Sequence, residues 1–283
     1  MRNLQYDLDI ALRNKEENCD CGYKAQNGTT YDRYMSNNSW MTFKEEMSKY
    51  YKNHYKHFES GGGGEIEEKR YPPKMACYGS SSRFIYLLLR DNFEVKFEHP
   101  IDTNVGGTAY LDAYLCKEDT DVFIEAKCRE IYGSKNNSIK KAYEDVYKFI
   151  SQSIGEEFYT NQGDVKNDPN RFICKFKHQG TPLYHLDIKQ LVYHFLAISA
   201  NHLTKDDAKS KIRFIYLIYN PDEFGNEKLN NIYKETMREI TMYDMIKLFN
   251  TVFEYQKKHL SISKNTPEFE FVFADQNTCK KYL

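Results

Sequence analysis

The segment KIRFIYLIYN, residues 211–220, is a nearly continuous apolar run that stops at Pro221. An amphipathic helix or a half-exposed strand would place polar residues at regular intervals, which this run does not. A strand covered on both faces needs such a run, because neither face meets water. We therefore expect residues 211–220 to form a central strand of an α/β sheet that has helices on both faces.

Three earlier segments also have the character of strands. Residues 93–101 (FEVKFEHPI) alternate between apolar and polar side chains, as a strand with one buried face does. Residues 108–117 and 121–130 follow, separated by a short polar stretch that suits a tight turn. We expect these three segments to form a β-meander, with 108–117 and 121–130 as its second hairpin.

The remaining apolar patterns are helical, apart from a last strand expected at 268–274. Ser80–Ser82 provide an N-cap for an apolar helix at 83–91. Further helices are expected near the following ranges: 139–154, 186–202 and 229–259. The fold class is thus α/β, a mixed central sheet with a β-meander and flanking helices.

The first 60 residues are polar and helical in pattern, with a helix expected within 41–58. The four glycines Gly61–Gly64 then interrupt regular structure. We therefore expect a helical N-terminal extension, residues 1–70, followed by the main domain, residues 71–283, with the two packed as one compact unit.

The composition restricts the class of protein. Forty Lys and Arg balance 41 Asp and Glu, which counts against a protein that coats nucleic acid non-specifically. No stretch approaches the roughly 18 apolar residues of a membrane-spanning helix, and the N-terminus has acidic residues where a signal peptide needs an apolar run. The seven cysteines are irregularly spaced, so we expect them to be reduced and the protein to be cytoplasmic.

Charged residues occur inside the two strands of the second hairpin. Glu125 and Lys127 share one face of their strand, because side chains alternate. A hairpin that turns about Glu118 and Asp119 pairs residues whose numbers sum to 237. Asp112 then lies opposite Glu125, with their Cβ atoms about 5 Å apart. A register slipped by one residue would separate the two carboxylates.

Two carboxylates at that distance repel each other unless a cation lies between them. Mg²⁺ is the expected cation, with Mn²⁺ as a substitute, because hard cations take oxygen ligands and usually one or two carboxylates. The expected ligands are Asp112, Glu125 and the backbone carbonyl of Ala126. Lys127 would stabilise charge on a phosphate, or orient and help deprotonate an attacking water.

The order Asp112, twelve intervening residues, then Glu125-Ala126-Lys127 resembles the split Asp…(Asp/Glu)-x-Lys signature of the PD-(D/E)XK nuclease superfamily. The order of the expected elements over roughly residues 79–275 is similar as well. This resemblance implies a restriction-endonuclease-like fold. It also implies Mg²⁺-dependent hydrolysis of DNA phosphodiester bonds.

Two further segments, Pro72–Met75 and Ser80–Arg83, look like a bacterial restriction-endonuclease-like branch of the superfamily. The chain departs from the family pattern at Leu111, where the signature has proline, and this makes the motif less specific. DNA is the partner that the resemblance implies. A homodimer is compatible with it, because cutting both strands usually requires two active sites.

Other residues have two interpretations each. Gln190 lies on the helix that such folds pack beside the site, where it would hold a metal-bound water or be an ordinary surface amide. Glu65 or Glu98 would supply a further carboxylate or simply be solvated. The three histidines near 186–202 are nine and eight residues apart, which is not the spacing of two ligands on one helical face, so we interpret them as structural: His185, His194 and His202.

Three alternatives remain open at the level of sequence. The first is the metal-dependent DNA endonuclease. The second is a catalytically silent nucleic-acid-binding or assembly module on the same fold. The third is an unrelated α/β hydrolase or interaction protein in which the charged hairpin is an ion cluster on a solvated sheet face.

Overall fold

The computed structural model of the chain describes residues 4–16, 20–61, 65–67, 72–133, 138–155 and 158–283. Gly62–Gly64 lie outside the described residues, so the expected break is described only at Gly61. The expected boundary between residues 70 and 71 also lies outside them.

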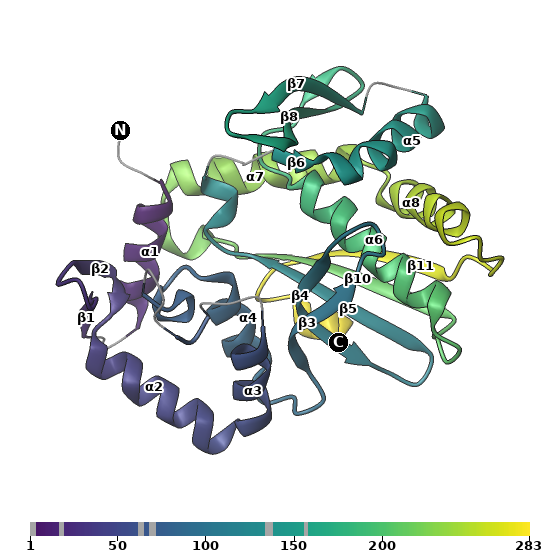
Figure 1. The fold of residues 1–283 in the computed structure, drawn as a ribbon. Coiled ribbons are helices and arrows are strands. Elements are labelled where there is room, and N and C mark those ends of the chain that lie inside the picture. The colour runs from purple at the N-terminus through teal and green to yellow at the C-terminus, as the bar shows by residue number, and fades with distance from the viewer. Residues whose placement is uncertain (1–3, 17–19, 62–64, 68–71, 134–137, 156–157) are drawn as a thin grey trace.

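A mixed five-stranded sheet forms the centre of the molecule (Figure 1). Its first three strands run parallel, and the last three form the antiparallel meander expected from the sequence. The α/β class and the mixed central sheet are therefore confirmed. In their order across the sheet, the strands are β11 (Glu268–Ala274), β10 (Lys211–Ile218), β5 (Thr120–Lys127), β4 (Thr108–Cys116) and β3 (Lys96–Asp102).

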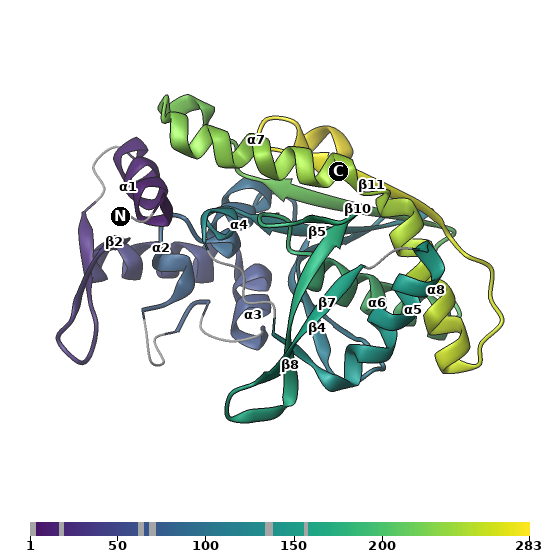
Figure 2. The ribbon, with the colours of Figure 1, turned by 90° about the horizontal axis from the view of Figure 1, so that it is seen from above.

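Helices cover both faces of this sheet (Figures 1 and 2). On one face lie α6 (Ile188–Thr204) and α8 (Met245–Leu260), and on the other lies α4 (Ser81–Leu89), whose N-cap is Ser80 as expected. We call the two apolar layers the α6-side core, which includes Phe195, and the α4-side core, which includes Tyr86. None of the described helices is both long and apolar enough to cross a bilayer.

The apolar run that begins at residue 211 is a central strand, as predicted. Phe214 and Tyr216 of β10 pack in the α6-side core, whereas Ile215 and Leu217 pack in the α4-side core. All four side chains are buried. The strand has no water-facing side, which is why its sequence has no polar alternation.

The N-terminal segment is only partly helical, so that expectation needs correction. It contains helix α1 (Leu4–Lys15) but also a hairpin of β1 (Cys21–Lys24) and β2 (Thr30–Met35). The helix expected within 41–58 is two helices, α2 (Asn37–Tyr50) and α3 (Lys52–Ser60), which meet at Tyr51, where φ is −126°.

Residues from this segment complete the α4-side core. Trp40, Met47 and Phe58 belong to the same buried cluster as Leu115 and Val122 of the central hairpin. The N-terminal helices therefore cover part of the central sheet, and their apolar positions are explained by this contact.

A second, smaller sheet was not predicted. Residues 138–140 form β6 rather than the start of a helix, and α5 begins at Glu144. Strand β8 buries Phe172, Cys174 and Phe176 on one side, but its partner β7 is mostly exposed and polar, so the sequence gives no paired apolar signal. The elements are β6 (Ser138–Lys140), α5 (Glu144–Ile154), β7 (Tyr159–Val165), β8 (Asp168–His178) and β9 (Thr181–Pro182), with β6 and β8 beside the first turns of α6 (Figure 1).

The long helix expected at 229–259 is two helices, because the chain changes direction after Met242. Helix α7 (Glu227–Met242) ends there, and Tyr243 adopts an extended conformation. Asp244 then begins α8, and its side chain accepts a hydrogen bond of 2.8 Å from the backbone N–H of Lys247. This carboxylate satisfies one of the backbone donors that the start of a helix leaves unpaired.

We predict that Asp244→Ala lowers the free energy of unfolding by about 1 kcal/mol, because the new helix start lacks a side-chain acceptor. The melting temperature should fall by about 2 to 4 °C. Asn250→Ala, an exposed change in the same helix, is the control and should leave the melting temperature unchanged or slightly higher. Equal melting temperatures for Asp244→Ala and the wild type would contradict the capping role.

Candidate active site

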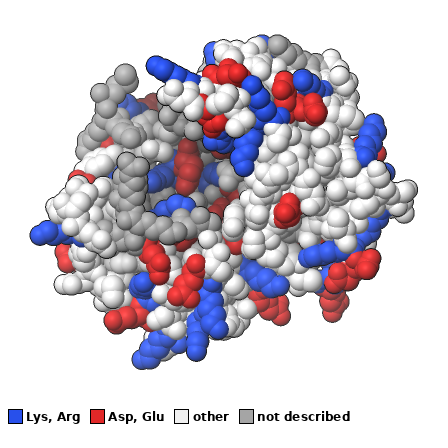
Figure 3. Space-filling view, viewed as in Figure 1, with Lys and Arg blue, Asp and Glu red and all other residues white. Residues whose placement is uncertain are grey.

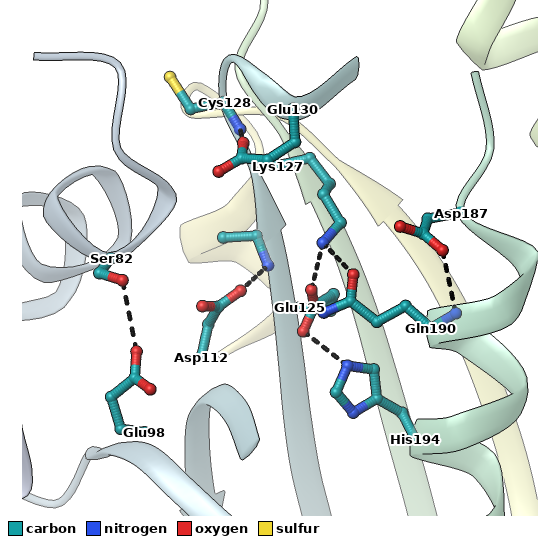
Figure 4. Close-up of polar contacts among 11 residues, drawn as sticks. Ser82, Glu98, Asp112, Glu125, Lys127, Cys128, Glu130, Asp187, Gln190 and His194 are labelled. Atoms are coloured by element: carbon teal, nitrogen blue, oxygen red, sulfur yellow. Dashed lines mark hydrogen bonds and ion pairs between the residues drawn. The ribbon is translucent and has the colours of Figure 1, made fainter. Parts of the chain in front are cut away.

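The register between β4 and β5 is the one predicted from the sequence. Ala113 pairs with Ile124, and the same pairing continues to the turn. The next positions along the two strands are Asp112 and Glu125, so these carboxylates lie at the end of the ladder. There, Asp112 Oδ2 accepts a hydrogen bond of 2.7 Å from the backbone N–H of Ala126 (Figure 4).

Carboxylates replace the missing ladder partners of β5 beyond this point. Asp112 satisfies the N–H of Ala126, and Glu130 Oε2 accepts from the N–H of Cys128 at 2.8 Å. The N–H and C=O of one strand residue point to the same side. The carbonyl of Ala126 therefore points to the edge of β5 where Asp112 lies, which places it with the expected ligand set.

Glu125 is buried at 2% exposure inside a strand with no exposed residue. One of its oxygens, Oε1, accepts a hydrogen bond from Nζ of Lys127, and the other, Oε2, lies 3.0 Å from Nε2 of His194 on α6 (Figure 4). A carboxylate this deeply buried needs such partners, because leaving water costs it several kcal/mol. The alternative of a solvated ion cluster does not describe this residue.

Lys127 is also buried, at 4% exposure. Its Nζ donates to Gln190 Oε1 at 2.5 Å as well as to Glu125 (Figure 4). An ammonium group has three N–H donors, so these two contacts leave one for another acceptor. Gln190 thus holds the lysine rather than lying as a free amide on the helix surface.

The start of α6 is fixed by two further carboxylates. Asp187 caps the helix by accepting from the backbone N–H of Gln190 at 3.0 Å. Glu239 of α7 accepts three backbone hydrogen bonds of 2.7 to 2.8 Å, from Tyr184, His185 and Leu186. Together they fix the loop and first turn that place Gln190 beside Lys127.

The sequence interpretation of His194 as structural missed its contact with Glu125. His194 and Gln190 are four residues apart and therefore lie on one face of α6. That spacing, read together with the expectation that this helix packs beside the site, is the signal that would have found it. His185 contacts Glu235 at 3.0 Å, and His202 is buried away from these carboxylates beside Phe253.

Glu98 lies opposite Asp112 on the neighbouring strand β3. Phe97 pairs with Ala113 and His99 with Leu111, which brackets these two residues. Glu98 has a φ of 48°, an unusual left-handed conformation for a residue with a side chain.

Regular side-chain alternation also fails at this point. Leu111 packs in the α6-side core but Ala113 packs in the α4-side core, although two residues that are two apart in a regular strand share a face. Leu111 therefore does not share a face with Ala113 and Leu115. The strand turns over at Asp112, between them.

The environments of Asp112 and Glu125 move their pKa values in opposite directions. Burial, followed by the charge of Glu125, raises the pKa of Asp112 well above its usual range. Burial alone would raise the pKa of Glu125 too, but Lys127 and His194 outweigh it and lower that pKa to about 2. Two neighbouring carboxyl groups whose environments shift their pKa values in opposite directions are typical of catalytic sites.

Two more glutamates lie near these carboxylates. Burial and the neighbouring charge of Glu65 raise the pKa of Glu98 to about 7, and Ser82 Oγ donates to Glu98 at 3.3 Å (Figure 4). Glu65 is buried at 2% exposure and pairs with Lys74 at 2.5 Å. Neither glutamate is solvated, so the interpretation of Glu65 and Glu98 as solvated side chains is wrong.

The surface is hollowed near the end of β5, with acidic and basic side chains on the floor of the hollow (Figure 3). Further basic side chains gather at its edge, below the small sheet (Figure 3). Burial and a neighbouring carboxylate raise the pKa values of Asp112 and Glu98, so an ionised carboxylate costs free energy at both positions. An added cation would remove that cost.

The donor chemistry fits Mg²⁺. The described residues contain no group of three His, Cys, Asp or Glu side chains arranged to hold a metal ion. Mg²⁺ does not require one, because it usually keeps several waters and takes only one or two carboxylates from a protein. Asp112, Glu125 and the carbonyl of Ala126 are such a set of oxygen donors.

Comparison of the chain with protein-family models, curated proteins and solved structures finds no match.

We predict that Glu98→Gln stabilises the protein at pH 8 but not at pH 4, measured as melting temperature in buffer with a chelator. The folded pKa of Glu98, about 7, exceeds its ordinary value of 4.5, so the unfolded state loses this proton first as the pH rises. Ionisation then costs the folded wild type up to about 3 kcal/mol, fully present above pH 7 and absent below 4.5.

The exposed residue Glu94 supplies the matched control, and Glu94→Gln should change the melting temperature equally little at both pH values. A Glu98→Gln effect that does not depend on pH would show that the carboxylate is not destabilised by burial.

Proposed function

We propose that the chain is a metal-dependent endonuclease that hydrolyses DNA phosphodiester bonds, with Asp112, Glu125 and Lys127 as catalytic residues. One observation carries the proposal: the Lys127 ammonium is buried between Glu125 and Gln190 at the end of a strand with no exposed residue. A buried ion pair is weak support for stability, since apolar residues of similar size would often be as good or better. The presence of the Lys127–Glu125 ion pair beside a second carboxylate, Asp112, is best explained by a catalytic role.

Mg²⁺, or Mn²⁺ in its place, would be held by Asp112, Glu125 and the carbonyl of Ala126. When bound, it would supply charge for a phosphate oxygen and lower the pKa of an attacking water. Asp112 is held for this role by the backbone N–H of Ala126, which fixes one of its oxygens and leaves the other available.

The protein's own groups do the rest. Lys127 has one N–H donor beyond those used by Glu125 and Gln190, and it would give this donor to a phosphate oxygen as negative charge builds up there. Gln190 and His194 are positioning residues, because they hold Lys127 and Glu125 from α6. The sequence suggested that Gln190 would hold a metal-bound water, whereas here its side chain holds Lys127.

The proposed fold family is the restriction-endonuclease-like one. The resemblance of Asp112 and Glu125-Ala126-Lys127 to the PD-(D/E)XK signature supports it. So does the position of these residues on a central antiparallel hairpin that joins a parallel strand in a mixed sheet. DNA as the substrate rests on that resemblance.

We predict that Lys127→Met and Asp112→Asn each lower the rate of DNA cleavage in Mg²⁺ or Mn²⁺ by at least about 100-fold, because each removes charge that acts on the reacting phosphate or on the cation. Nicking and linearisation of supercoiled plasmid measure the rate. Lys117→Met is the matched control, since Lys117 is an exposed lysine at the turn end of the same hairpin. Its rate should remain within about twofold of the wild type.

Circular dichroism and melting temperature establish that each variant is folded. A folded wild type that cleaves no form of DNA, and shows no cation binding by titration calorimetry, would overturn the proposal. Cation-independent DNA binding without cleavage would instead favour the catalytically silent module.

A further inference from the structure

A pocket of about 330 Å³ opens beside the site, between the small sheet and the first two turns of α6. It differs from the metal-ligand region in chemistry, because its charged residues are mainly basic. The residues that line it include Lys140, Arg171, Lys189, Tyr143, Tyr193 and Gln190.

The basic side chains favour an anion in this pocket. Lys140, Arg171 and Lys189 line it together with one carboxylate, Asp187, which already caps α6. The Nε atom of Arg171 is buried and meets no acceptor among the described residues. A buried guanidinium nitrogen without a partner is costly, and a phosphate oxygen is a ligand that fits its geometry.

Two tyrosines, Tyr143 and Tyr193, line the same pocket. The rings of Tyr143 and Tyr193 are 5.1 Å apart and inclined at 58°. Their hydroxyl groups abut Gly107 in the β3–β4 turn, where an added Cβ would lie 2.3 Å from the Tyr193 oxygen and 3.1 Å from that of Tyr143. The turn therefore lies against both hydroxyl groups. Tyr143 is buried at 4% exposure and packs against the partly buried Tyr193, whose ring offers a surface on which an unpaired base can stack.

Gln190 connects this pocket to the catalytic residues. It lines the pocket, and its Oε1 accepts from the ammonium of Lys127. A group bound in the pocket is thus one side chain away from the proposed reacting phosphate.

The volume of the pocket limits the size of the group that it can bind. A volume of 330 Å³ corresponds to a sphere about 9 Å across, which suits a small organic ligand. A space of this size takes a single nucleotide rather than a stack of base pairs. Basic side chains and a tyrosine ring that line a space this small match one nucleotide, with its phosphate on the basic groups and its base against Tyr193.

We propose that this pocket binds a single unpaired nucleotide of a DNA strand, next to the phosphate that Lys127 contacts. The inference rests on the proposed function and deepens it: the substrate class is DNA with an unpaired nucleotide at the cleavage site, such as a single-stranded extension, flap or bulge. Fully paired DNA has no unpaired nucleotide for the pocket to bind.

The test measures DNA binding by fluorescence anisotropy in EDTA, where no cleavage occurs. One DNA is a fully paired duplex, and the other is the same duplex with an extension of about six thymidines. Arg171→Ala should weaken binding of the extended DNA about tenfold and that of the paired duplex less than twofold. Lys140→Ala, a change at an exposed position that cannot disturb the core, should act in the same direction.

Lys175→Ala is the matched control, because Lys175 is an exposed lysine on the same strand and the same side as Arg171 but does not line the pocket. Equal weakening of both DNAs by Arg171→Ala, or no weakening of either, would overturn the proposal. Displacement of the extended DNA by thymidine monophosphate at a concentration near the Kd of that DNA would overturn it too, by assigning the pocket to a free nucleotide. Absence of cleavage in Mg²⁺, with pocket-dependent binding intact, would count against the proposed function alone.

Discussion

The ion pair between Lys127 and Glu125 inside β5 determines what must pack around it. Both side chains are almost fully buried, so each loses most of its hydration, and their mutual attraction compensates only if the remaining donors and acceptors are also paired. Helix α6 provides the partners, through Gln190 and His194 on one face. The position of α6 against the sheet is therefore constrained by polar contacts as well as by its apolar residues.

That constraint extends outward to the loop before α6. Helix α6 can keep Gln190 in hydrogen-bond contact with Lys127 only if its first turn has a fixed position. The Asp187 cap and the hydrogen bonds to Glu239 fix that position. Glu239 belongs to α7, which follows β10 in the sequence, whereas α6 precedes β10. Segments before and after the central strand therefore both help to position the site. Rigid support of this kind is what a catalytic arrangement needs, since small displacements of the reacting groups are costly.

Much of the central sheet was predictable from the sequence, because its signals are local. The β4–β5 register followed from a short turn, and Asp112 and Glu125 follow from that register. The contact of His194 with Glu125 was missed because it depends on how α6 is rotated, which the apolar pattern of a mostly buried helix specifies poorly.

Other elements were missed for reasons that are equally physical. Strand β7 is exposed and polar, and its pairing with β8 is visible only in three dimensions. The reversal of alternation at Asp112 lies opposite Glu98 on another strand, and Glu98 itself has an unusual φ. A non-glycine residue in that conformation gives no sign of it in the sequence.

The near-neutral net charge hides a separation of charge that bears on the proposed chemistry. Glu65, Glu98, Asp112 and Glu125 gather at the site, while basic residues such as Arg171 line the adjoining pocket. A DNA phosphate approaching this surface would be attracted by the pocket and repelled by the carboxylates. A divalent cation among the carboxylates would reverse that repulsion, so in the proposed function cation and DNA binding should strengthen each other by the same factor. Asp112 and Glu98, whose pKa values are raised by burial, would then make the binding of DNA depend on the cation that cleavage requires.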